Sequence, residues 1–209
     1  MKRILIAGVA LALMAVMATS LSAADRKGMI GVGVGGGALL PMGDFGDESK
    51  LGWRAGVGAG YFVTNEIAIG ATGAFSNNKA SDDLLTALQV IDSTITDAKT
   101  QIIEFGAWGK YFFKMQSDKV APYVKAGVGG YNAKAKVESG SGSASASETN
   151  LGINGGVGAM FSVSPTASIF VEGAFHNIFS DPSANYITAT AGVAFMFGGS
   201  SSTGGGNTE

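Results

Sequence analysis

The 209-residue chain has no cysteine, only four prolines and a single histidine. Without cysteine it has no disulfide bonds and no thiol chemistry, and one histidine excludes a multi-histidine metal site. Basic residues do not exceed acidic ones, 14 against 16, so nothing in the charge balance points to nucleic acid. Beyond residue 24, no stretch reaches the roughly 20 apolar residues that a membrane-spanning helix needs. If the mature protein enters a membrane, it enters as strands.

The first 24 residues have the pattern of a secretory signal peptide. Two basic residues, Lys2 and Arg3, precede an uncharged apolar run at 4–17, and small residues end the segment. The apolar run is short for an uncleaved membrane anchor. We therefore expect a signal peptide at 1–24, a mature chain that starts at Asp25, and export of the protein.

Glycine, by contrast, is abundant, with 33 residues, and many of the glycines belong to a recurring pattern. In four segments a glycine is followed five positions later by an aromatic ring, and the residues between them alternate so that one face is wholly apolar. Such alternation is typical of a strand that faces an apolar environment. A ring of aromatics at one depth is typical of a membrane interface in a transmembrane β-barrel. The four segments are Gly56 to Tyr61, Gly106 to Tyr111, Gly156 to Phe161 and Gly192 to Phe197.

Over the whole chain, the alternation predicts eight strands with connections of unequal length. Short turns follow the second, fourth and sixth strands, and longer loops follow the others, which is the pattern of outer-membrane barrels. We expect an all-β fold, an eight-stranded antiparallel up-and-down transmembrane β-barrel at 25–197, and a disordered Gly/Ser-rich tail at 198–209. The expected strands are 28–40, 50–63, 66–78, 100–113, 120–136, 150–163, 167–179 and 186–197.

Aromatic residues gather at both ends of the expected strands. Two aromatic belts flanking an apolar band are expected where rings lie at headgroup depth. The alternative is the general enrichment of aromatics in sheets, but their confinement to strand ends favours the belts. The set at the short-turn end, which we assign to the periplasmic rim, is Tyr61, Tyr111, Phe113, Phe161, Phe195 and Phe197. The looser set at the opposite end is Trp53, Phe75, Phe175, Phe179 and Tyr186.

Two of the long connections have distinct sequences. In 79–99, apolar residues at helical spacing from Leu84 to Ile95, with Ser81 as a cap, predict a short amphipathic helix on the outer mouth of the barrel. An extension of the two neighbouring strands is the alternative. The segment 137–149 is of low complexity and predicts a mobile loop.

The residues that alternate with the aromatics face the barrel interior. Many are glycines, so larger inward residues such as Trp108, Tyr123 and Phe170 must fill the space. A lone charge at bilayer depth is costly, so charges there face the interior and pair. We expect a closed charge network that holds the interior together; a polar path for a small solute is the alternative. The ionisable residues with inward parity are Arg54, Glu104, Lys110, Lys125, Glu172 and His176.

Motifs that would indicate an enzyme or a cofactor site are weak. Gly31, Gly33 and Gly36 have a dinucleotide-type spacing, but strand pattern continues where that motif requires a helix. His176 has Ser180 as its nearest nucleophile in sequence, and Ser180 falls beyond the strand. We expect no catalytic residues, no cofactor and no metal.

The last expected strand carries a polar residue, a glycine, a hydrophobic residue and a terminal aromatic in a fixed order, namely Thr190, Gly192, Phe195 and Phe197. This order resembles the C-terminal signal by which the assembly machinery recognises outer-membrane barrels. Together with the other features, the chain resembles the small eight-stranded outer-membrane β-barrel family of the OmpA transmembrane domain and OmpX-like proteins. The resemblance implies the outer membrane of a Gram-negative bacterium, a monomeric barrel, outer-membrane lipid and the assembly machinery as partners, and long loops outside the cell.

The resulting functional hypothesis is a non-enzymatic outer-membrane barrel with a structural or surface-interaction role, and the alternative is a narrow porin with a Gly-lined polar lumen. Some eight-stranded barrels modify lipid A, but the deacylases among them place a serine two residues after a histidine, where this chain has Ile178. A soluble periplasmic barrel is disfavoured because the outward faces are nearly uncharged. An extracellular ligand would meet the acidic loop residues Asp44, Asp47, Glu48, Asp82, Asp83, Asp92 and Asp97.

Overall fold

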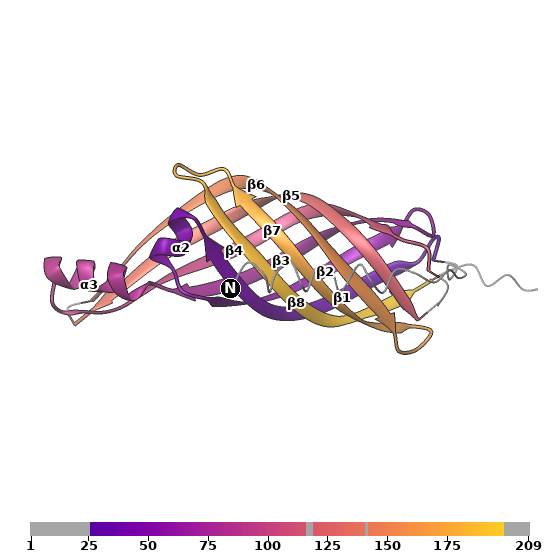
Figure 1. The fold of residues 1–209 in the computed structure, drawn as a ribbon, viewed down its shortest axis with the longest axis horizontal. Coiled ribbons are helices and arrows are strands. Elements are labelled where there is room, and N and C mark those ends of the chain that lie inside the picture. Colours follow the sequence, from indigo (N-terminus) through magenta and orange to yellow (C-terminus); the bar gives the residue numbers. More distant parts are fainter. Residues whose placement is uncertain (1–25, 116–118, 141, 199–209) are drawn as a thin grey trace, which may run out of the picture.

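The structure, a computed structural model, describes residues 26–115, 119–140 and 142–198; the predicted signal peptide and all but the first residue of the predicted tail lie outside them. Eight strands form one closed antiparallel barrel in which each strand pairs with its neighbours in sequence and β8 pairs with β1 (Figure 1). The predicted fold class is confirmed. The strands are β1 Ile30–Met42, β2 Gly52–Phe62, β3 Ile67–Lys79, β4 Ile95–Phe112, β5 Val120–Ser139, β6 Gly142–Ser162, β7 Ala167–Ile178 and β8 Ala184–Phe197.

The register tilts the strands strongly against the barrel axis. Cα partners followed once round the barrel from Val32 pass through every strand and return to β1 at Met42, ten residues further along. A shear of this size over eight strands corresponds to a tilt of about 40°. Residues at one height in the barrel are therefore offset in register from strand to strand.

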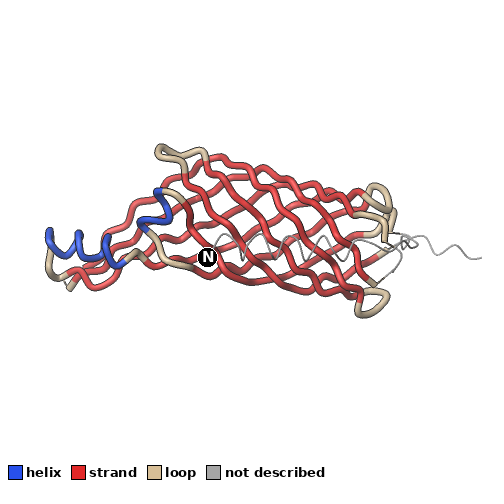
Figure 2. Tube along the Cα trace, in the orientation of Figure 1, coloured by secondary structure: helices blue, strands red, loops and turns tan. Residues whose placement is uncertain are grey.

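The two ends of the barrel differ as predicted (Figure 2). At one end, called here the short-turn end, brief connections join β2 to β3, β4 to β5 and β6 to β7. The other, the long-loop end, carries the helices α2, Asp44–Glu48, and α3, Asp82–Ile91. The described part of the chain contains no helix with both the length and the hydropathy needed to cross a membrane.

The predicted helix in 79–99 is confirmed as α3, but its position and extent differ from the prediction. Ser81 Oγ accepts a hydrogen bond from the Leu84 amide at 3.2 Å and caps the helix. No residue of α3 is buried, so the helix projects from the barrel instead of packing on its mouth (Figure 1). Ile95, counted with the helical apolar residues, begins β4.

The mobile loop predicted at 137–149 is wrong, because β5 and β6 continue past the other strands as a long hairpin. Their ladder runs without interruption from the body of the barrel to the pair Ser139↔Gly142. Backbone pairing does not depend on large side chains, and the serines at 143, 145 and 147 alternate with small residues at strand period. The hairpin therefore extends the barrel wall at the long-loop end.

Side chains alternate along the strands between an outward apolar face and an inward face. On β2, for example, Tyr61 is 47% exposed and Arg54 is 8% exposed. The six aromatics assigned to the short-turn end all point outward. Tyr186 was wrongly assigned to the opposite belt: it is fully buried and points into the barrel, where its ring stacks on His176.

Apolar and aromatic side chains fill the interior at both ends. The cluster at the short-turn end, the lower plug, contains Phe62, Ala68, Phe112, Ala121, Tyr123, Met160 and Met196. The cluster at the long-loop end, the upper plug, contains Leu39, Ile102, Tyr131, Ile178 and Tyr186. Glycines make room for the largest rings: a Cβ at Gly60 would collide with the Trp108 ring, and a Cβ at Gly35 would lie 2.9 Å from Phe170 Cζ.

Candidate functional site in the barrel interior

The six ionisable residues singled out by parity all point inward between the two plugs. They come from four strands, Arg54 from β2, Glu104 and Lys110 from β4, Lys125 from β5, and Glu172 and His176 from β7. The strand alternation that turns the neighbouring residues toward an apolar exterior turns these side chains inside. The structure brings them together as two separate groups, so the single closed network that we expected is incorrect.

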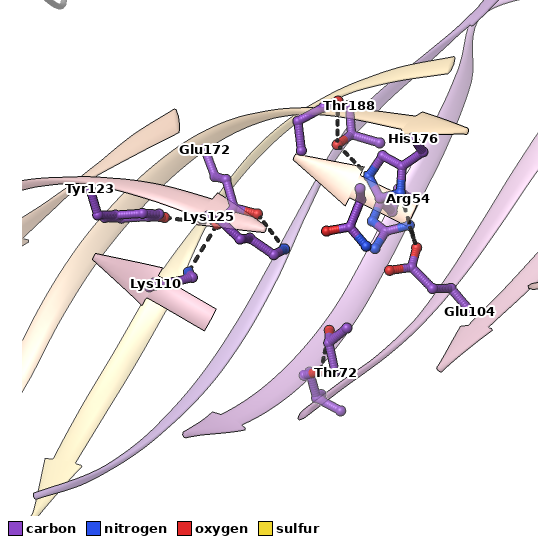
Figure 3. A network of polar contacts seen from close by, with 12 residues as sticks. Arg54, Thr72, Glu104, Lys110, Tyr123, Lys125, Glu172, His176 and Thr188 are labelled. Atoms are coloured by element: carbon purple, nitrogen blue, oxygen red, sulfur yellow. Dashed lines mark hydrogen bonds and ion pairs between the residues drawn. The ribbon is translucent and has the colours of Figure 1, made fainter. Parts of the chain in front are cut away.

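The first group lies next to the lower plug and is called here the Lys–Glu–Lys cluster (Figure 3). Glu172 Oε2 is 2.9 Å from Lys110 Nζ, and Glu172 Oε1 is 2.9 Å from Lys125 Nζ. Tyr123 donates its hydroxyl hydrogen bond to the same carboxylate at 2.9 Å, and the Lys110 ammonium lies 4.2 Å from the centre of the Tyr123 ring. One carboxylate thus bridges two ammonium groups, and a cation–π contact supports one of them.

The second group lies next to the upper plug and is called the Arg–Glu–His cluster. Arg54 Nη1 donates to Glu104 Oε2 at 2.6 Å, and the two side chains are 9% and 1% exposed. His176 Nδ1 lies 3.7 Å from the same Glu104 oxygen. Each of these buried charges depends on the other, because either one alone would be left uncompensated in the interior.

Residues outside the predicted charge network hold His176 in place, and one of them is Tyr186, which the sequence analysis assigned to the opposite belt. Its ring stacks on Tyr186 with centroids 4.5 Å apart, while Nδ1 lies 3.3 Å from the Tyr131 hydroxyl and Nε2 lies 3.4 Å from Thr188 Oγ1. Asn154 Nδ2 in turn donates to the Tyr131 hydroxyl at 3.2 Å. Both ring nitrogens thus face polar partners in the packed interior. Strand parity could have identified these residues from the sequence, because all of them lie on the inward face of their strands.

A cavity of about 140 Å³ lies inside the barrel between the two plugs. Both charge clusters contribute to its walls through Arg54, His176, Lys110, Lys125 and Glu172. No hydrogen bond or ion pair links the two clusters within the described ranges. The rest of the lining combines six glycines, Gly31, Gly33, Gly35, Gly56, Gly58 and Gly60, with larger residues that include Phe62, Ala68, Phe112, Met160 and Met196 of the lower plug.

The residues of the predicted assembly signal lie on β8, the strand that closes the barrel against β1. Thr190 and Gly192 line the interior, and Phe195 and Phe197 point outward at the short-turn end. Across the described residues, no group of three or more His, Cys, Asp or Glu side chains is arranged to hold a metal ion.

A closed barrel with an apolar exterior, outward aromatics near its ends and paired charges inside is a transmembrane β-barrel. The sequence profile of the family described as "Outer membrane protein beta-barrel domain" matches residues 9–197. The chain belongs to this family and is an outer-membrane protein of the Gram-negative type. No curated protein sequence matches the chain.

Solved structures of outer-membrane barrels share the fold. Ail of Yersinia pestis is 18% identical over 82% of this chain and 99% of its own, with a TM-score of 0.53. Neisserial surface protein A is 19% identical over 82% and 98%, with a TM-score of 0.58. A major outer membrane protein from Thermus thermophilus is 13% identical over 81% and 99%, with a TM-score of 0.63. At these identities the likeness concerns the fold alone.

Proposed function

We propose that this protein is a sealed, non-enzymatic outer-membrane barrel with a structural or surface-interaction role. The observation that carries the proposal is the filling of the lumen in layers. From the short-turn end these are the lower plug, the Lys–Glu–Lys cluster, the Arg–Glu–His cluster and the upper plug, and the cavity extends from the lower plug to the Arg–Glu–His cluster. An eight-stranded barrel is just wide enough for side chains to fill. A solute that crossed this lumen would have to displace rings and break ion pairs at both levels.

The short turns at one end and the longer loops at the other support the proposed orientation, with the short-turn end in the periplasm and the long loops outside the cell. On this proposal residues 1–24 direct export, β8 presents the assembly signal to the barrel assembly machinery, and the folded protein is a monomer in outer-membrane lipid. The closed ladder between β8 and β1 is consistent with a monomer, because it leaves no strand edge unpaired in the body of the barrel.

The long-loop end is the proposed interaction surface. It carries α2, which packs on the barrel through Phe45, and also α3 and the extended hairpin of β5 and β6, which project beyond the body of the barrel (Figure 1). Ail of Yersinia pestis, 18% identical with a TM-score of 0.55, has been crystallised with the heparin analogue sucrose octasulfate. That complex supports the idea that a barrel of this fold can present a ligand surface. We place such a surface on the projecting elements of this chain.

A narrow porin is the second candidate, and the glycine-lined cavity between the plugs favours it. Planar-bilayer recording separates the two functions. The sealed barrel predicts no steady conductance for the folded wild-type protein, with a boiled sample as the negative control and a general porin as the positive control. Steady conductance that changes in Lys110→Gln or Lys125→Gln, and not in Lys114→Gln at the exposed short-turn end, would show that the lumen conducts.

A further inference from the structure

Four lysines form a band on the outward surface of the barrel, on one side only. Lys79 on β3, Lys99 on β4, and Lys134 and Lys136 on β5 share the outward parity of their strands. The ladder places three of them side by side, since Lys79 pairs with Lys99 and Lys99 pairs with Lys136. We call these four residues the lysine band. In the described ranges, no other outward-facing strand position holds a cation.

The height of the lysine band follows from the register. Along the outward face of β4, the apolar residues Phe105 and Ile103 are followed toward the long-loop end by Gln101 and then by Lys99. On β3, Phe75 is followed by Asn77, whose register partner is Trp53, and then by Lys79. Each outward step of two residues is about 7 Å along a tilted strand. Lys79 and Lys99 therefore lie two outward positions beyond Phe75 and Ile103, and Lys134 and Lys136 lie three and four beyond Val128, so the band begins at headgroup depth on the long-loop side.

The charges of the band are only partly compensated by the protein. Glu138 Oε1 lies 2.9 Å from Lys99 Nζ and 2.8 Å from Lys136 Nζ, and Asp97 Oδ2 is 3.8 Å from Lys99 Nζ. Hydrogen bonds from Lys136 and Lys99 hold the pKa of the Glu138 carboxyl down to about 2, so this group is ionised at neutral pH. Lys79 and Lys134 are exposed and make no ion pair in the described part of the chain. Four cations against two anions leave an excess of two positive charges.

We infer that the lysine band binds the phosphate groups of a phosphorylated glycolipid in the outer leaflet. The inference rests on the proposed orientation of the barrel and is independent of whether the lumen conducts. A solvated, purely solubilising surface would not confine its outward cations to one side of the wall just beyond the apolar surface. Basic side chains immediately outside an apolar span attract anionic headgroups, and an ammonium is a point donor that suits a phosphate oxygen. Lys79 and Lys134 supply the two positive charges that have no ion-pair partner in the described part of the chain, while Lys99 and Lys136 both pair with Glu138.

Native mass spectrometry of the purified barrel with lipid A that carries two phosphates tests this inference. Lys79→Gln/Lys134→Gln removes the two free cations, and Lys27→Gln/Lys114→Gln removes the same charge at the opposite end. At about a fivefold effect per lysine, the first variant is expected to bind lipid A roughly 5- to 25-fold more weakly. The control variant is expected to match wild type. Retained heat-modifiable gel mobility shows that each variant is folded.

Two further samples separate the possible occupants of the band. Lipid A stripped of its phosphates is expected to bind wild type and Lys79→Gln/Lys134→Gln equally weakly. Equal binding of phosphorylated lipid A to wild type and to that variant would overturn the inference. A second result would also overturn the inference: wild type binds sucrose octasulfate through Lys79 and Lys134 but does not retain lipid A. The lysine band would then bind a soluble glycan. Conductance of wild type would contradict the sealed lumen and leave these results unchanged.

Discussion

The Glu172→Gln variant is expected to unfold at a much lower denaturant concentration than wild type, with a loss of about 3–5 kcal/mol in the free energy of unfolding. The substitution leaves Lys110 and Lys125 inside the barrel without the carboxylate that bridges them at 2.9 Å on each side. Two buried like charges then repel each other across the gap. Unfolding in detergent, followed by heat-modifiable gel mobility, measures the change.

The matched control is Glu66→Gln. Glu66 also forms an ion pair with a lysine, at 3.1 Å, but Lys114 is 70% exposed and the pair lies at the short-turn end. The hydrogen bond from Lys114 lowers the pKa of the Glu66 carboxyl, yet water solvates both partners. Little change in the unfolding midpoint is expected. If Glu172→Gln behaved like this control, the Lys–Glu–Lys cluster would contribute nothing to holding the interior together.

The second large effect is expected at the Arg–Glu–His cluster, where a double substitution should be milder than a single one. Arg54→Met leaves the Glu104 carboxylate, only 1% exposed, without its cation and should cost about 3–5 kcal/mol. Arg54→Met/Glu104→Leu removes both charges and should recover most of that loss, because apolar replacements of a buried pair are often neutral. The double-mutant cycle of unfolding free energies measures the coupling.

Lys50→Met provides the surface comparison for this cycle. Lys50 and Asp82 lie 2.6 Å apart, as close as Arg54 and Glu104, but their side chains are 46% and 84% exposed. The unfolding midpoint of Lys50→Met should stay near that of wild type, because water solvates both partners of this pair. A double variant that is no more stable than Arg54→Met alone would contradict the interpretation of the interior charges as paired structural elements.

The barrel itself was predictable because membrane strands leave a strong pattern. Tyr61, Tyr111 and Phe161 repeat at one end of their strands, and the residues between belts alternate without charge on the outward face. Alternation fixes which side chains share a face, so the inward direction of Arg54 and Glu172 followed directly. The helix α3 was also predictable, since Ser81 and the spacing of the leucines act locally.

The partners inside the lumen were not predictable from parity alone. Arg54 and Glu104 lie on different strands, and they meet because a ten-residue shear brings those positions to one height. The shear is a property of the closed barrel, and it cannot be deduced from the sequence of a single strand. The shear also places Glu172 and Glu104 at different heights, so the interior charges form two clusters.

Tyr186 and the β5–β6 hairpin show two other sources of error. Tyr186 lies near a strand end, where belt residues are expected, but its even-numbered position on β8 matches Thr188 and Met196, which face inward. Strand parity therefore predicted the direction of the Tyr186 side chain better than its place near the strand end. In the hairpin, residues 137–149 were predicted to be a mobile loop because their sequence is of low complexity, although the ladder there depends on the backbone.

The proposed function requires that the chain is a closed barrel in the outer membrane. Cell fractionation combined with gel mobility before and after boiling tests this most directly. We expect recovery in the outer-membrane fraction and a change in mobility on heating, because the unboiled barrel keeps its closed ladder between β1 and β8. Recovery in the soluble periplasm, with the same mobility before and after boiling, would contradict it.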